Sequence, residues 1–150
     1  MGSTKTTVFP ASRARSTARD FCNGPPLATR YFHTGLDDQD TVWAAINLAI
    51  SLNALARWVE TKDLVRKALP AAHRSIGRDD EYTLKLEKAL LKATHEDKGS
   101  SLDELRKAIS MCEGGYRRAR RVYGDSHPIT AELARELDLA REVLAERAQS

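Results

Sequence analysis

The heptapeptide GDSHPIT at residues 124–130 shares its skeleton with two earlier segments, GRDDEYT at residues 77–83 and GLDDQDT at residues 35–41. Each segment runs from a glycine through five residues to a threonine, and the two earlier ones also share a pair of aspartates. The glycines lie 42 and 47 residues apart, and self-similarity at a period of about 20–50 residues is typical of repeat proteins. We therefore expect three similar units, at residues 35–76, 77–123 and 124–150.

Apolar residues between these segments recur at the spacing of amphipathic helices, and no segment alternates with the period of a strand. We expect an all-α chain with helices over residues 41–57, 59–76, 81–95, 101–123 and 129–148. Pro70 predicts a kink in the second helix or its end at Leu69. The sequence SLDE at residues 101–104 predicts a capping box at the start of the fourth helix.

The second helix of each pair carries a small residue at a matched position. Counted back from Gly77 and Gly124, the residue nine positions earlier is Ala68 in the first unit and Gly115 in the second. A small residue lets two helix backbones approach closely. This gives Gly115 a packing role that offsets its cost in a helix, about 1 kcal/mol relative to alanine.

The segments GLDDQDTVWAAINLA (35–49) and LVRKALPAAHRSIG (64–77) resemble a tetratricopeptide repeat of the kinesin light chain type. That pattern runs roughly Gly-x-Asp-His-Pro-x-Thr, then Asn-Leu-Ala, then Arg-Ala-Leu before the next glycine. This chain has Asn-Leu-Ala at 47–49, Lys-Ala-Leu at 67–69 and His-Pro at 127–128. The triplet becomes Ala-Leu-Leu and then Glu-Leu-Asp in the later units, and most of the characteristic aromatic residues are missing.

The resemblance implies an antiparallel helix-pair superhelix of about two and a half repeats over residues 35–150, with the last helix as a C-terminal cap. In such arrays the first helix of each pair lines a concave surface that holds an extended peptide or a partner helix. The resemblance places these residues on that surface: Trp43, Ile46, Asn47, Ile50 and Asn53 from the first unit, Lys85, Lys88, Lys92 and His95 from the second, and Glu132, Arg135, Leu139 and Glu142 from the third.

These residues suggest what the surface would bind. In the family, an asparagine at the position of Asn47 bonds the backbone of the bound peptide, for which a carboxamide supplies both donor and acceptor. Lys85, Lys88 and Lys92 form a positive stripe beside an apolar and amide patch. We therefore expect a non-enzymatic protein-interaction module or scaffold whose partner is a short acidic segment with an apolar or aromatic anchor.

Plainer interpretations of the same residues stay open. The lysines are equally consistent with a solvent-exposed helix face paired with Glu81 and Glu87. Trp43 and Trp58 suit packing positions, and Asn47 suits a buried amide that bridges neighbouring helices. Under these interpretations the protein is a structural accessory subunit of a larger, possibly organellar, assembly. Self-association is a further possibility, because helix-pair arrays usually need about three repeats for stability.

The segment YRRARRVYG at residues 116–124 raises the question of nucleic-acid binding. Its arginines, at 117, 118, 120 and 121, spread around more than half of a helix, and acidic stretches flank them. Arginine is in any case favoured near a helix C-terminus by the helix dipole. We expect nucleic-acid binding to be the least favoured of the interaction functions.

Patterns typical of catalysis are missing from the sequence. The four histidines, His33, His73, His95 and His127, lack metal-ligand spacing, and the two cysteines match no metal or redox motif. Neither a Gly-rich phosphate loop nor a nucleophile motif is present. We predict no catalytic residue, no metal site and no cofactor.

The positive charge of the chain is concentrated at its N-terminus. Residues 1–34 hold five of the 24 basic residues and one of the 21 acidic residues, a net charge of +4, which leaves −1 for residues 35–150. A near-neutral repeat region disfavours a nucleic-acid-binding fold. No apolar run approaches the roughly 18 residues of a membrane span, and two unpatterned thiols suit a reducing compartment. We expect a cytoplasmic protein.

Residues 1–34 read as a basic, irregular arm. Up to Arg19 they are rich in Arg, Ser and Thr and lack acidic residues, as organelle transit peptides do, so a plastid or mitochondrion is the alternative compartment. The start MGSTKT fits the myristoylation pattern, which would provide a membrane contact not otherwise expected. A simple tail, or the remnant of a preceding repeat, is also compatible with the sequence.

Overall fold

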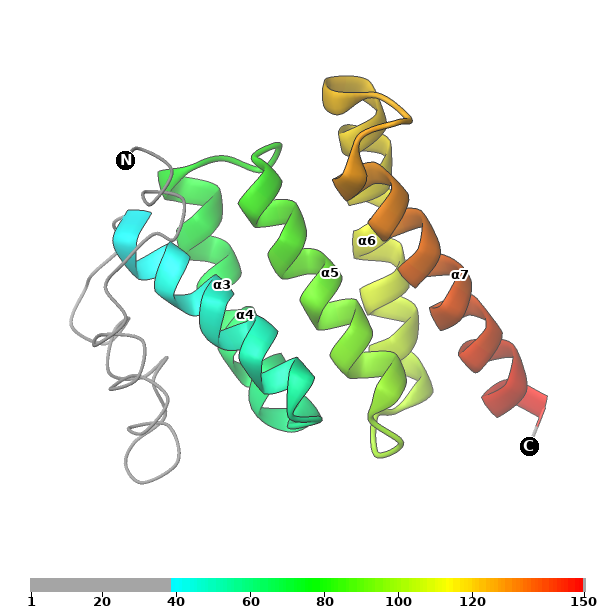
Figure 1. The fold of residues 1–150 in the computed structure, drawn as a ribbon. Coiled ribbons are helices and arrows are strands. Elements are labelled where there is room, and N and C mark those ends of the chain that lie inside the picture. Colours follow the sequence, from blue (N-terminus) through cyan, green and yellow to red (C-terminus); the bar gives the residue numbers. More distant parts are fainter. Residues whose placement is uncertain (1–38, 150) are drawn as a thin grey trace.

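The computed structural model describes residues 39–149 (Figure 1), and these residues are helical, with no strand among them. The predicted all-α class is confirmed for this part of the chain. Residues 1–34, to which the arm was assigned, lie outside the described residues, as does the glycine of the first repeat motif. The helices are α3 Gln39–Ala54, α4 Trp58–Ser75, α5 Glu81–Glu96, α6 Leu102–Tyr123 and α7 Pro128–Gln149.

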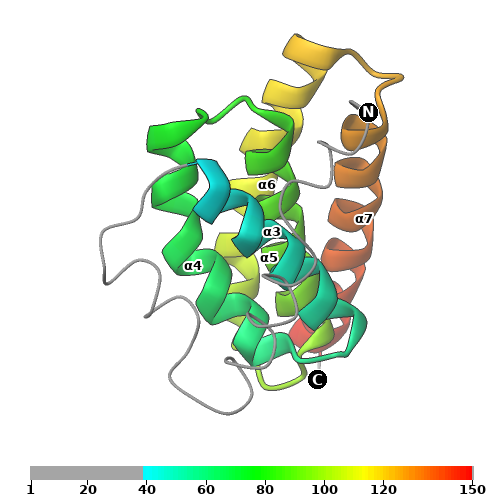
Figure 2. The same ribbon diagram turned by 60° about the vertical axis from the view of Figure 1, so that its left-hand side comes forward.

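The helices form two layers. In Figure 1, α3, α5 and α7 lie side by side in front, with α4 and α6 behind them, and the turned view in Figure 2 separates α4 from α7 on opposite sides. Each helix packs against its neighbour in sequence, and α5 contacts all four of the others. Helix α5 is therefore the central helix and packs against helices of both layers.

The hydrophobic core is split around α5. One cluster of buried residues joins α3 and α4 to Leu86, Ala89 and Leu90 of α5. A second cluster joins α6 and α7 to Leu84 and Leu91 of the same helix. Helix α5 therefore buries two of its faces, one in each cluster, and a third face is left for the surface of the front layer.

The repeated Gly-to-Thr segment connects consecutive helix pairs. Gly77 and Gly124 follow α4 and α6 with φ of +95° and +91°, which glycine adopts without the strain of a side chain. The hydroxyl of Thr83 donates to the carbonyl of Gly77 at 2.7 Å, so the two ends of the second motif are bonded to each other. Asp80 caps α5 by accepting a hydrogen bond from the backbone N–H of Tyr82 at 2.8 Å.

Two further expectations concern helix ends, and they have opposite outcomes. The capping box is confirmed, because Ser101 Oγ accepts from the N–H of Glu104 and the Glu104 carboxylate accepts from the N–H of Ser101, both at 3.0 Å. Of the two alternatives predicted for Pro70, a kink or an end at Leu69, the end is wrong, since α4 continues through Pro70 to Ser75. Pro70 lies on the exposed side of α4, where water can bond the carbonyl that proline leaves unpaired.

Gly115 has the packing role predicted for it, but the space that its missing side chain leaves is filled by side chains of α5 and not by a neighbouring backbone. A Cβ atom at Gly115 would overlap with Oε1 of Glu87 on α5. The Glu87 side chain is only 2% exposed and accepts a hydrogen bond from Arg118 Nη2 at 2.8 Å. The interpretation of Glu87 as a partner of the lysines is therefore wrong, because its carboxylate is buried between α5 and α6.

None of the helices in residues 39–149 combines the length and the apolar character needed to cross a bilayer.

Candidate functional site

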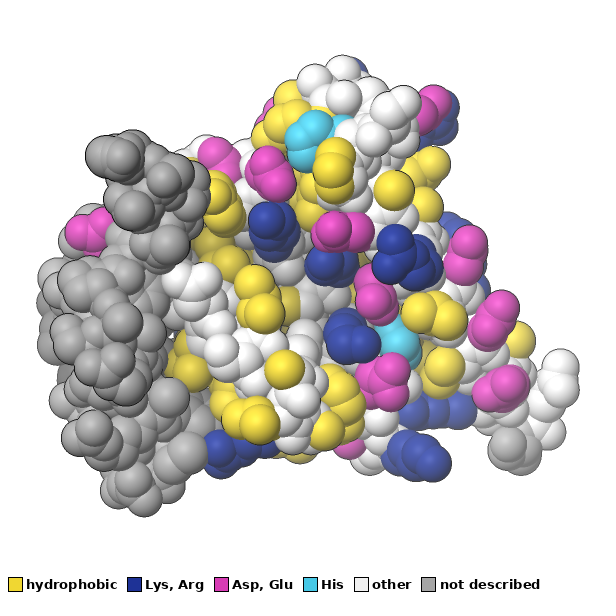
Figure 3. Space-filling model, in the orientation of Figure 1, with side chains coloured by type: hydrophobic (Ala, Val, Ile, Leu, Met, Phe, Trp, Pro, Cys, Tyr) yellow, Lys and Arg dark blue, Asp and Glu magenta, His cyan; other side chains and the backbone are white. Residues whose placement is uncertain are grey.

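The front layer carries a groove of about 390 Å³ between α3 and α5, closed on one side by α7. In Figure 3, basic side chains follow the course of α5 across this face, with apolar side chains toward α3 and acidic ones toward α7. We call it the lysine groove. It is lined by Ile50, Asn53 and Ala54 from α3, Lys85, Lys88, Ala89 and Lys92 from α5, and Glu132 from α7.

The residues that α3 contributes to the groove, together with Ala89 of α5, are apolar apart from the amide of Asn53. Asn53 is 8% exposed, and its Nδ2 donates to the carbonyl of Ala89 at 3.2 Å, which ties α3 to α5. The small side chains of Ala54 and Ala89 leave the hollow open. Ile50 lies at its edge with 53% of its surface exposed, so the groove offers an apolar contact beside its charges.

Each lysine of the groove has an acidic neighbour. Lys85 and Lys92 pair with residues of their own helix, Glu81 at 3.5 Å and Glu96 at 4.0 Å. Lys88 reaches across to α7, where its Nζ lies 2.6 Å from Oε1 of Glu132. All of these side chains are between about a quarter and a half exposed. Partly exposed pairs of this kind contribute only about 0–1 kcal/mol, so an incoming carboxylate can replace them.

The lining of the groove has a surplus of positive charge. Three lysines and one glutamate give it a net charge of +2. The pairs of Lys85 and Lys92 within α5 are also what an ordinary solvent-exposed helix face would show. What distinguishes the groove is that these lysines lie around one hollow together with the exposed Ile50.

Six of the thirteen residues predicted for this surface line the groove, and the other seven, which include the exposed Leu139 and Glu142, do not. Ile46 is 3% exposed within the α3–α4–α5 core, and His95 is 5% exposed beneath α7, so their placement on the groove surface is corrected. Trp43 and Asn47 are half-buried, and Trp43 packs on Tyr82 with ring centroids 5.9 Å apart. Arg135 is exposed but does not line the groove.

Helix α7 is fixed on α5 by polar contacts below the groove. His95 Nε2 and Glu136 Oε1 lie 2.8 Å apart. Burial alone would raise the pKa of the Glu136 carboxyl, but the hydrogen bond with His95 and the charges of His95, Lys92 and Lys88 hold it below its ordinary value.

Arg147 fixes the far end of α7. Its guanidinium donates to the carbonyls of His95, Asp97 and Ser100 at 3.0–3.3 Å. Sequence reasoning placed Glu132 on this surface but missed Glu136 and Arg147, although the spacing of four between Glu132 and Glu136 already places both carboxylates on one side of the last helix.

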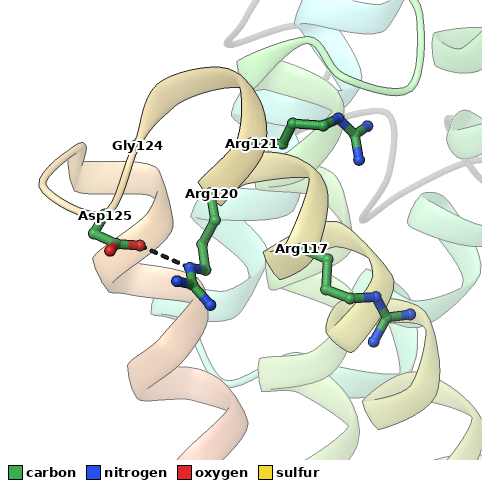
Figure 4. Close-up of a pocket in the computed structure, with 5 residues that line it drawn as sticks. All are labelled: Arg117, Arg120, Arg121, Gly124 and Asp125. Carbon is green, nitrogen blue, oxygen red and sulfur yellow. Dashed lines mark hydrogen bonds and ion pairs between the residues drawn. The ribbon is translucent and has the colours of Figure 1, made fainter.

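A second hollow, of about 410 Å³, lies at the end of α6 and is lined by Arg117, Arg120, Arg121, Gly124 and Asp125. Figure 4 shows Arg120 turned toward Asp125, 2.7 Å away, while Arg117 and Arg121 extend outward. Arg118 points the other way, into the interface with Glu87. The four arginines therefore do not form one continuous basic patch. Arg118 pairs with Glu87 in the interface, and of the three arginines that line the hollow, Arg120 already pairs with Asp125.

Neither a metal site nor a reactive thiol is found within residues 39–149. They contain no group of three His, Cys, Asp or Glu side chains placed to hold a metal ion. Burial raises the pKa of the Cys112 thiol well above its ordinary value, and its Sγ donates to the carbonyl of Glu87 at 3.2 Å. A buried, protonated thiol of this kind is a packing group.

Comparisons with protein-family models, with curated proteins and with solved structures gave no match. The resemblance to tetratricopeptide repeats therefore rests on the residues quoted for it.

Proposed function

We propose that this chain is a non-enzymatic protein-interaction module that holds a short acidic segment of a partner protein in the lysine groove. The observation that carries the proposal is the convergence of Lys85, Lys88 and Lys92 on one hollow with the exposed Ile50 at its rim. Carboxylates of the ligand would pair with the lysines, and an apolar side chain would cover Ile50 and the two alanines.

The helix arrangement supports this proposal. We take α3–α4 and α5–α6 as two helix pairs of a tetratricopeptide-like superhelix, with α7 as the first helix of a third pair and as its cap. In support, α3, α5 and α7 pack together as one layer, and each of α4 and α6 packs behind the helix that precedes it. In solenoids of this kind the shared inner layer is the binding surface.

The energetics favour a partner that brings both charge and apolar surface. Replacing exposed intrachain pairs by ligand carboxylates yields little net free energy per pair. Covering apolar surface contributes about 25 cal/mol per Å², so the anchor supplies much of the affinity and the charges supply orientation and selectivity. We expect weak affinity that falls as salt concentration rises.

The proposal is tested by peptide binding to the full chain. A fluorescein-labelled peptide with one leucine and two glutamates is titrated with wild type and with the double variant Lys85→Ala/Lys92→Ala, and anisotropy is recorded. We expect binding about tenfold weaker in the variant, as expected for the loss of about 1.4 kcal/mol from two contacts. Circular dichroism checks that the variant is folded.

The matched control is Lys98→Ala/Lys107→Ala. It removes the same charge from two exposed lysines outside the groove. If both double variants weaken binding equally, the peptide responds to net charge and the groove is not its site. If wild type does not bind the peptide at all, the proposed function is wrong.

A second candidate function, the structural accessory subunit, is favoured by the turn between α3 and α4. Leu55 lies in this turn and Val59 in the first turn of α4, with 66% and 59% of their surfaces exposed, and a neighbouring subunit would cover both under this proposal. Under this proposal Leu55→Ser/Val59→Ser would weaken assembly in cell extracts and leave the peptide titration unchanged. For the compartment, our proposal stays the cytoplasm, with an organelle as the alternative that depends on residues 1–34.

A further inference from the structure

Glu132 is the only acidic residue among the described residues that line the lysine groove. It belongs to α7, and its pair with Lys88 at 2.6 Å is the shortest of the three lysine pairs. The middle lysine of the stripe thus pairs with a residue of the groove lining, while the ion pairs of Lys85 and Lys92 are longer and lie at the two ends of α5, where Lys85 also lies over the ring of Tyr82.

The two walls of the groove differ in charge. The α7 wall carries Glu132. Glu136 lies behind it, and the charges of Lys88 and Lys92 contribute to lowering the pKa of its carboxyl. The α3 wall carries Ile50, Ala54 and the amide of Asn53 and has no charge. A ligand therefore meets one carboxylate, that of Glu132, on one side at the middle of the groove and apolar surface on the other side.

The separation of Lys85 and Lys92 determines how far apart two carboxylates of a ligand must be to pair with both lysines. They are seven residues apart on one helix, which corresponds to about 10.5 Å along the axis at 1.5 Å per residue. A chain in the polyproline II conformation rises about 3.1 Å per residue with three residues per turn, so its side chains three positions apart lie on one face and about 9.3 Å apart. Two acidic residues with two others between them therefore match the two outer lysines.

On the basis of the proposed function, we infer that the lysine groove selects segments in the polyproline II conformation with two acidic residues three positions apart and uncharged residues between them, and that Glu132 enforces this selection. Of the two residues between them, one faces α7, where an acidic side chain would meet Glu132 and would have to displace it from Lys88. An apolar side chain on the opposite side of the segment would meet Ile50.

The first test varies the peptide and leaves the protein unchanged. Two labelled peptides of identical composition, each with two glutamates and one leucine, are compared by anisotropy with wild-type protein. In one the glutamates are three positions apart, and in the other they are adjacent. We expect the spaced peptide to bind three- to tenfold more tightly. Equal binding of the two would overturn the inference and leave the groove as a site for acidic segments. Binding of neither would overturn the proposed function itself.

The second test varies the protein. A third peptide with an additional glutamate between the spaced pair is titrated against wild type, Glu132→Gln and the control Glu142→Gln, which alters an exposed residue of α7 outside the groove lining. We expect the additional glutamate to bring no gain in wild type and in Glu142→Gln, and a gain of about threefold in Glu132→Gln. If the extra glutamate strengthens binding to wild type as much as to Glu132→Gln, the role of Glu132 is overturned.

Discussion

Glu87 and Lys88 are neighbours on α5, yet they belong to two regions with opposite properties. Glu87 is buried against α6, where Arg118 pairs with it and Gly115 leaves room for its carboxylate. Lys88 lies in the groove, with more than a quarter of its side chain exposed, and pairs with Glu132. The comparison shows that one helix separates its charges by their surroundings. The buried charge of Glu87 belongs to the interface between α5 and α6, and the partly exposed charge of Lys88 can pair with a ligand.

The largest expected effect breaks the buried pair. Arg118→Met leaves the Glu87 carboxylate without its partner, so we expect the free energy of unfolding at pH 8 to fall by about 3 kcal/mol. The matched control is Arg117→Met, which removes a neighbouring arginine that is exposed and should change stability by about 0.5 kcal/mol or less. Urea denaturation measures both. Equal losses would show that Glu87 does not need Arg118.

The next effect concerns pH. Burial raises the pKa of Glu87 from its ordinary 4.5 to about 7, against the opposing charge and hydrogen bond of Arg118 and the charge of Arg78. A raised carboxyl pKa means that the folded state binds the proton more tightly. The contribution of Glu87 to stability is therefore fully present below about pH 4.5 and is lost as pH rises through about 7. The loss is at most about 3.5 kcal/mol at about 1.4 kcal/mol per pKa unit.

Glu87→Gln isolates this contribution, because the variant keeps the shape of the side chain and cannot ionise. We expect the stability of wild type relative to Glu87→Gln to decrease between about pH 5 and pH 7 and to level off above that in denaturation experiments. A difference that is flat over this range would mean that Glu87 is not desolvated in the folded state.

The smallest expected effect lies in the groove. Lys88→Ala removes the pair with Glu132, and since both side chains are partly exposed we expect the free energy of unfolding to change by about 0.5 kcal/mol or less. Thermal denaturation compared with Lys98→Ala, an exposed lysine elsewhere, checks this. A loss of about 2 kcal/mol or more would make the Lys88–Glu132 pair part of the packing and would remove the contrast between the two regions.

The local sequence predicted the features that depend on residues a few positions apart on the same helix. The capping box at Ser101 and the stripe of Lys85, Lys88 and Lys92 follow from spacing along a single helix. Their partners within three or four residues are fixed by helix geometry, so no knowledge of the rest of the fold is needed.

Burial on the neighbouring faces could not be predicted in this way. Ile46 and His95 have the spacing of groove residues, but they are covered because α5 and α7 pack over them. Glu87 is buried because Gly115 and Arg118, about thirty residues later, provide space and charge for it. Which face of a helix is covered depends on how the adjacent helix is placed, and that information is distributed over residues distant in sequence.

The division of the core around α5 has a consequence for how the chain melts. Because α5 contributes buried leucines to both clusters, neither cluster can lose this helix without exposing part of the other. The two core clusters are therefore thermodynamically coupled. Residues 39–149 should denature in a single cooperative transition, although the sequence consists of similar successive units.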